Sequence, residues 1–114
     1  RFAVVNCWKP IHGAALDAPL AVCDAQTIDS SDMLETDLRY TDRTGEIYSF
    51  AHSEAHRWFY YPEMTTDEAL LIKGYDSAPD RARFTAHTAI RPLGSNRDLP
   101  PRQSLEVRTL AFFD

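Results

Sequence analysis

The sequence predicts an all-β fold, a sandwich or a barrel, for this chain of 114 residues. Short apolar or aromatic runs recur along the whole chain, and proline, glycine and aspartate separate them. No long stretch repeats apolar residues at helical spacing, and at most one helical turn is expected, around residues 31–34. A chain of this length buries roughly two thirds of its unfolded surface, so a single core is expected.

Four strands are expected in the first half of the chain. Pro10 should end the first of them, because proline has no N–H to donate to a ladder. A turn rich in polar residues separates the third from the fourth, and Gly45 should supply the positive φ that a hairpin turn needs. The four expected strands are residues 2–8, 19–23, 37–41 and 46–50.

The second half of the chain predicts four more strands and one long loop. Four prolines and glycines within residues 91–102 exclude a strand there. Seven or eight short strands fit half of a jelly roll with irregular connections, so residues 1–114 are expected to form part of one domain. The expected strands are residues 57–61, 69–75, 83–88 and 105–113.

The last predicted strand carries an unusual face. Successive side chains of a strand point to opposite sides, so every second residue shares a face. One face is polar at its start and apolar at its end, which suits the wall of a half-wet cavity better than a plain surface. Its residues are Ser104, Glu106, Arg108, Leu110 and Phe112.

Composition excludes several function classes. The chain holds 12 Lys and Arg against 17 Asp and Glu, and its scattered basic residues do not favour binding of nucleic acid. No apolar run approaches the roughly 20 residues of a membrane span, and nothing in these residues reads as a secretory signal. Cys7 and Cys23 lack metal-binding or redox spacing, so two free thiols and a cytoplasmic protein are expected.

The beginning of the chain is also informative. It opens directly in the strand-like run of residues 2–8, without an initiator methionine or a polar lead-in. Domains usually begin with a few loosely held residues. We therefore expect the C-terminal portion of a larger domain, with an N-terminal half of the same protein preceding it.

Histidines are the first candidates for chemistry. Non-haem iron in oxygenases is held by two histidines and one carboxylate, which leave positions open. The only His-x-acid string is His52-Ser53-Glu54, in an expected loop. His87 lies among small residues near the end of an expected strand, where a metal site has room, although a hydrogen-bonded core histidine is the alternative. His56 is expected to be structural and His12 to lie on the surface.

Two arginines near the C-terminus could hold a carboxylate. A guanidinium offers a fork that matches a carboxylate with two hydrogen bonds. Arg108 lies on the half-wet face of the last strand, where pairing with Glu106 is the simpler alternative. Arg102 competes for the role, although it follows two prolines.

Five strings in one order resemble a known family. They are NCWKP (6–10), DAPLAVCDA (17–25), HRWFYYP (56–62), DEALLIK (67–73) and RFTAHTA (83–89). Together they resemble the fungal hydroxylase/desaturase family, which includes a gibberellin desaturase and relatives of the cephem methoxylase accessory protein. The resemblance extends almost from end to end of the chain.

The resemblance implies an Fe(II)- and 2-oxoglutarate-dependent oxygenase of fungal secondary metabolism, on a double-stranded β-helix. It implies that His87 is an iron ligand and that Arg108 binds the co-substrate, with Arg102 also in the matching segment. The family's His-x-Asp pair is then expected upstream of Arg1. The expected substrate is an apolar secondary metabolite, which is hydroxylated or desaturated. The alternative is a non-catalytic accessory module of the same fold that binds a partner enzyme or a metabolite.

Overall fold

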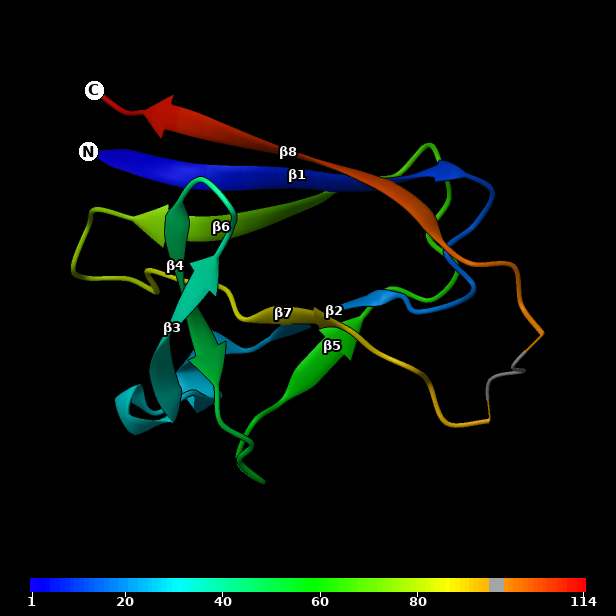
Figure 1. The fold of residues 1–114 in the computed structure, drawn as a ribbon, viewed down its shortest axis with the longest axis horizontal. Helices are drawn as coiled ribbons and strands as arrows, with labels where there is room; N and C mark the ends of the chain where they lie inside the picture. Colours follow the sequence, from blue (N-terminus) through cyan, green and yellow to red (C-terminus); the bar gives the residue numbers. More distant parts are fainter. Residues whose placement is uncertain (95–97) are drawn as a thin grey trace.

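The chain forms two three-stranded antiparallel sheets and one separate hairpin (Figure 1). The computed structural model describes residues 1–94 and 98–114, and within them the only helices are the 3-10 turns Ala25–Thr27 and Ser30–Asp32. The second turn overlaps the one helical turn expected around residues 31–34, and the first was not expected from the sequence. The strands are β1 (Phe2–His12), β2 (Leu20–Cys23), β3 (Met33–Arg39), β4 (Thr44–Phe50), β5 (Trp58–Tyr60), β6 (Leu70–Asp76), β7 (His87–Ala89) and β8 (Gln103–Phe112).

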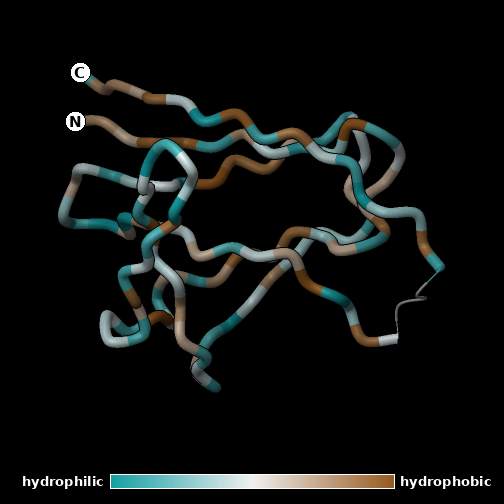
Figure 2. The backbone as a smooth tube through the Cα atoms, viewed as in Figure 1, coloured by the Kyte–Doolittle hydropathy of each residue, from teal (hydrophilic) through white to brown (hydrophobic). Residues whose placement is uncertain are grey.

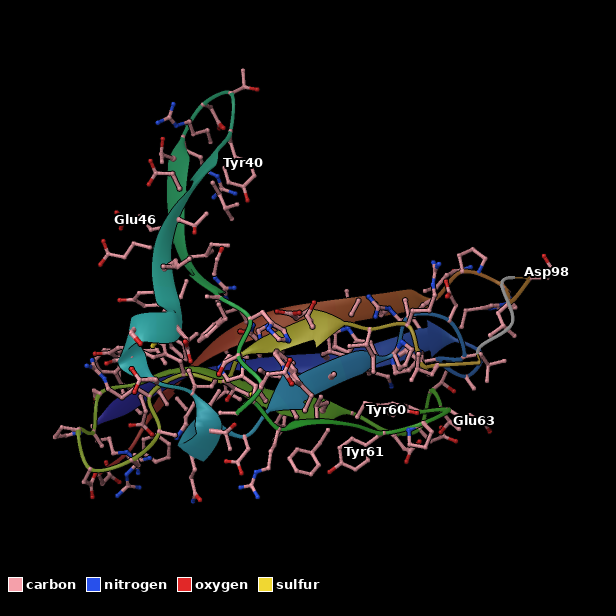
Figure 3. All side chains as sticks on the ribbon, turned by 90° about the horizontal axis from the view of Figure 1, so that it is seen from below. Tyr40, Glu46, Tyr60, Tyr61, Glu63 and Asp98 are labelled. Carbon is pink, nitrogen blue, oxygen red and sulfur yellow. The ribbon has the colours of Figure 1, made fainter. Side chains whose placement is uncertain are left out.

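The two sheets form two layers, and the chain passes repeatedly from one to the other (Figure 1). The first sheet has the order β6-β1-β8 and the second the order β5-β2-β7. Because β1 and β8 pair along almost their whole length, from Phe2 opposite Phe112 to His12 opposite Gln103, the two chain ends lie side by side. Strands β3 and β4 pair only with each other and stand away from both layers, as Figure 3 shows for the arm that carries Tyr40 and Glu46.

The core lies between the layers at one end of the molecule. Trp8, Leu20, Met64 and Ile72 form a buried cluster with Ala15. In Figure 2 the first part of β6 is hydrophobic, whereas hydrophilic and hydrophobic residues alternate along β8. Every residue of β8 is exposed or half-buried, so neither face of this edge strand belongs to the core.

The expectation that Pro10 ends the first strand is wrong. Strand β1 continues to His12, and Pro10 pairs with Ser104 of β8. The ladder with β6 ends at Trp8, so beyond it β1 has a neighbour on one side only. A proline is tolerated where no N–H is needed on the open side of a strand, and the register shifts directly after it.

The predicted hairpin is present, but its turn differs from the expectation. Gly45 lies inside β4, opposite Leu38, and not in the turn. The turn spans residues 40–43, closed by a hydrogen bond from the Tyr40 N–H to the Arg43 carbonyl. Among described glycines, only Gly13 and Gly94 have a positive φ. The hairpin therefore needs no glycine at its tip.

The predicted strand 83–88 is largely wrong, because β7 contains only His87–Ala89. Its partner β2 is short and pairs only as far as Val22 opposite His87. Before it, the Arg83 side chain donates to the Asp76 carbonyl and to the Tyr75 hydroxyl, which holds this segment against β6 instead. His87 thus begins a strand and does not end one.

The remaining expectations for the chain concern its loop, thiols and hydropathy. The described residues of the predicted loop 91–102 contain no strand or helix, and residues 95–97 lie outside the described ones. Cys7 and Cys23 are both free thiols, as expected. Within residues 1–94 and 98–114, no helix has the length and apolar character needed to cross a bilayer.

Candidate functional site

A cavity of about 1060 Å³ is bounded by both sheets and by the hairpin. The central strand β1 contributes Val4 and Asn6, and β8 contributes Arg108. The second sheet contributes His87 at the start of β7. Two of the residues predicted from the sequence, His87 and Arg108, therefore line the same cavity from different sheets.

The imidazole of His87 is oriented by the backbone just before it. Its Nδ1 lies 2.9 Å from the Thr85 carbonyl oxygen. A carbonyl oxygen can only accept, so Nδ1 carries the proton and donates it. In the neutral ring Nε2 then has a free lone pair, and the side chain is exposed. A histidine that binds a metal usually donates its other ring N–H to a carbonyl or carboxylate, as here.

Arg108 lies in a hydrogen-bonded cluster with Asn6 and Glu106, called the Arg108 cluster below. Its Nε donates to Asn6 Oδ1 at 3.2 Å, and Asn6 Nδ2 donates to Glu106 Oε1 at 2.6 Å. The expected simple alternative, a direct pair between Arg108 and Glu106, is thus replaced by an amide between them. No ion pair of Arg108 occurs within the described ranges.

Arg102 lies outside the lining of this cavity. Its Nη1 donates to the Ala18 carbonyl, and its guanidinium lies 5.3 Å from the centre of the Trp8 ring. Both contacts join the start of β8 to the core. The two candidate arginines therefore differ in the structure: Arg108 lines the cavity, whereas Arg102 contacts the Ala18 carbonyl and the Trp8 ring.

The remaining histidines lie away from the cavity lining. His52 and Glu54 are exposed and sit outside any strand. The His56 ring is buried, and its Nε2 lies 3.0 Å from Asp32 Oδ2, as expected for a structural histidine. In the described part of the chain no group of three His, Cys, Asp or Glu side chains could hold a metal ion by itself.

The hairpin and an aromatic contact complete the cavity wall. Tyr48 of β4 packs edge-on against Phe84 with ring centres 5.1 Å apart, and Phe84 contacts Tyr75 of β6 at 5.8 Å. Three hairpin carboxylates also line the cavity: Glu35, Asp37 and Glu46. The cavity therefore has an aromatic side and an acidic side.

Sequence reasoning missed Asn6 and misjudged the far end of β8. Asn6 is buried, with 3% of its surface exposed, within an otherwise apolar run. A single buried amide in such a run is a signal that could have marked it, since buried polar groups need partners. Leu110 and Phe112, expected to point inward with Arg108, are 61% and 78% exposed and are not among the residues that line the cavity.

Comparison with known proteins adds a family match. The family model described as "Oxidoreductase/YMDC permease-like domain" matches residues 1–112. "Aspirochlorine biosynthesis protein N" of Aspergillus oryzae is 38% identical across 100% of the chain and 49% of its own length. "Hydroxylase/desaturase asaB" of Aspergillus flavus is also 38% identical, across 100% of the chain and 56% of its own length.

A solved structure matches as well. The "iron and alpha-ketoglutarate-dependent endoperoxidase NvfI" superposes with a TM-score of 0.88 at 31% identity, covering 97% of this chain and 42% of that one. The predicted all-β jelly-roll fold and the resemblance to fungal hydroxylase/desaturases are confirmed by these matches. The chain spans about half the length of the relatives that it matches.

Proposed function

The chain belongs to the Oxidoreductase/YMDC permease-like domain family, and from this premise we propose that it forms the C-terminal part of an Fe(II)- and 2-oxoglutarate-dependent dioxygenase. Its relatives include proteins named as such dioxygenases and as hydroxylase/desaturases. The observation that carries the proposal is one cavity that His87 and Arg108 line from two sheets. A metal ligand and a carboxylate anchor on separate walls suit a co-substrate that bridges them.

The surroundings of His87 fit an iron ligand. The Thr85 carbonyl holds the Nδ1 proton, which leaves Nε2 for the metal. Bound iron would supply oxidation by dioxygen coupled to decarboxylation of the oxo-acid. The described residues offer no three-ligand group, so we propose that the remaining ligands come from an N-terminal half of the same protein.

Arg108 is proposed to hold the distal carboxylate of 2-oxoglutarate. Its Nε is already bound by Asn6, and the two terminal nitrogens remain as a fork for a ligand. A bidentate contact of this kind fixes direction as well as affinity. Arg102 is the weaker candidate, because the Ala18 carbonyl and the Trp8 ring engage it.

The aromatic side of the cavity suits an apolar substrate. Tyr48 and Phe84 supply apolar surface beside His87, where a secondary metabolite could be oriented. Hydroxylation and desaturation use the same residues of this chain, so both outcomes belong to the proposal. A cytoplasmic location is part of it as well, and the two free thiols support this.

The test is His87→Ala in the whole protein that contains this chain, with His52→Ala as the matched control. The first change removes one of the iron ligands, so decarboxylation of 2-oxoglutarate should fall to background and the bound iron should decrease. The second removes an exposed histidine away from the cavity lining and should leave both unchanged.

Two results would contradict this assignment. Undiminished decarboxylation in His87→Ala would remove His87 from the iron site. A wild-type protein that neither binds Fe(II) nor consumes 2-oxoglutarate would favour the accessory module of the same fold, which binds a partner enzyme or metabolite instead.

A further inference from the structure

The Arg108 cluster contains a buried amide whose orientation is fixed on both sides. Asn6 lies on the central strand β1, directly opposite Arg108 in the ladder with β8. A guanidinium can only donate and an ionised carboxylate can only accept. Oδ1 of Asn6 must therefore face Arg108, and Nδ2 must face Glu106. In the structure Oδ1 lies 3.2 Å from Arg108 Nε, and Nδ2 lies 2.6 Å from Glu106 Oε1. The flipped amide would lose both bonds.

We infer that Asn6 is a positioning residue, which keeps the fork of Arg108 directed into the cavity and away from Glu106. This inference rests on the proposed role of Arg108 as the co-substrate anchor. Arg108 and Glu106 lie two residues apart on one face of β8, within reach of each other. Without a group between them, opposite charges at this spacing attract, and the fork would turn toward the carboxylate of its own strand.

The burial of Asn6 is what makes it effective. Only 3% of the surface of Asn6 is exposed, whereas Arg108 and Glu106 are exposed. The amide is therefore held by packing as well as by its two hydrogen bonds, and a flexible side chain gains a fixed partner at its Nε. Orienting a flexible binding group before the ligand arrives lowers the ordering cost of binding.

The first test is Asn6→Ala in the whole protein, with the KM for 2-oxoglutarate measured at saturating iron and substrate. That KM should rise about tenfold, equivalent to about 1.4 kcal/mol, while kcat at saturating 2-oxoglutarate stays within about twofold. If Asn6→Ala fails to fold, Asn6→Ser carries the same expectation, because the serine hydroxyl is one bond shorter and offers a single atom where Asn6 directs two atoms to its two neighbours.

The decisive step is to add Glu106→Gln to Asn6→Ala. If Asn6 acts by keeping Arg108 from Glu106, removing the charge of Glu106 should recover most of the lost affinity for 2-oxoglutarate. A merely structural role would show no such recovery. Thr109→Val is the matched control. The Thr109 hydroxyl donates to the Val5 carbonyl at 2.8 Å and joins the same two strands, but Thr109 does not line the cavity. The KM of this variant for 2-oxoglutarate should therefore not change.

Each outcome separates this inference from the proposed function. A raised KM in Asn6→Ala that Glu106→Gln does not reverse, or an equal rise in Thr109→Val, would overturn the positioning role. An unchanged KM in Asn6→Ala alongside a raised KM in Arg108→Gln would overturn it too and would leave the anchor in place. An unchanged KM in Arg108→Gln would overturn the anchor itself.

Discussion

Two polar clusters lie on the same three-stranded sheet, and they differ in how completely their groups are bonded. At the end of β6, the carboxylate of Asp76 is fully buried. It accepts from Arg1 Nε at 3.2 Å and Nη2 at 2.9 Å, from Lys73 Nζ at 3.3 Å and from the Ala78 N–H at 3.0 Å. These four residues form the Asp76 cluster, in which each carboxylate oxygen accepts at least two bonds.

The Arg108 cluster also contains an arginine and a carboxylate, but not all of its donors are hydrogen-bonded. Asn6 is bonded on both sides, whereas Arg108 lines the cavity and, among the described residues, bonds through its Nε alone. A cluster whose groups bond one another stabilises the fold and has little left for a ligand. A cluster with an unused fork contributes less to stability, and its free donors are available for recognition. The comparison separates residues of the fold from residues of the site.

The largest effect on stability is expected for Asp76→Asn. Arg1 and Lys73 donate to one carboxylate oxygen, and Arg1 and Ala78 donate to the other. Whichever oxygen becomes the amide NH2 group, a donor then faces two donors, and both cations lose their buried counter-charge. The Tm should fall on the order of 10 °C. Asp80→Asn is the matched control, because Arg81 binds Asp80 through the same two nitrogens at 3.1 Å on the surface.

In that exposed pair the Tm should change by less than about 3 °C, measured by circular dichroism. Equal losses in Asp76→Asn and Asp80→Asn would show that burial and completeness do not distinguish the two carboxylates. The comparison between the clusters would then lose its basis.

A smaller effect on the Tm is expected when the pH is lowered, because acid protonates the Asp76 carboxylate. The hydrogen bond from Arg1 chiefly, and then that from the Ala78 N–H, hold the pKa of Asp76 well below its ordinary value. Its unfolded pKa is about 3.9, so its contribution to stability is complete above that pH and is lost as the pH falls toward the folded pKa. Between pH 5 and pH 3 the Tm of the wild type should therefore fall more steeply than that of Asp76→Asn. Parallel curves would contradict this assignment.

Much of this arrangement could be predicted from the sequence, because strand alternation and turn residues report on local structure. The face shared by Glu106 and Arg108 follows from a period of two. The register that sets Asn6 opposite Arg108 spans about a hundred residues of chain and depends on the whole ladder. The brevity of β7 likewise depends on its partner β2, and nothing within residues 83–88 reports on it.

Arg108→Gln, compared with Arg102→Gln, tests the central claim most directly: the incomplete cluster on β8 serves recognition of 2-oxoglutarate. In the whole protein at saturating iron, Arg108→Gln should raise the KM for 2-oxoglutarate roughly 30- to 1,000-fold through loss of a bidentate charge-assisted contact. The Tm of this variant should change by only a few degrees, since the substitution removes one hydrogen bond to Asn6. Arg102→Gln should lower the Tm more than Arg108→Gln does, because it loses the Ala18 and Trp8 contacts, and it should leave the KM for 2-oxoglutarate nearly unchanged. A larger rise in KM for Arg102→Gln would contradict the account.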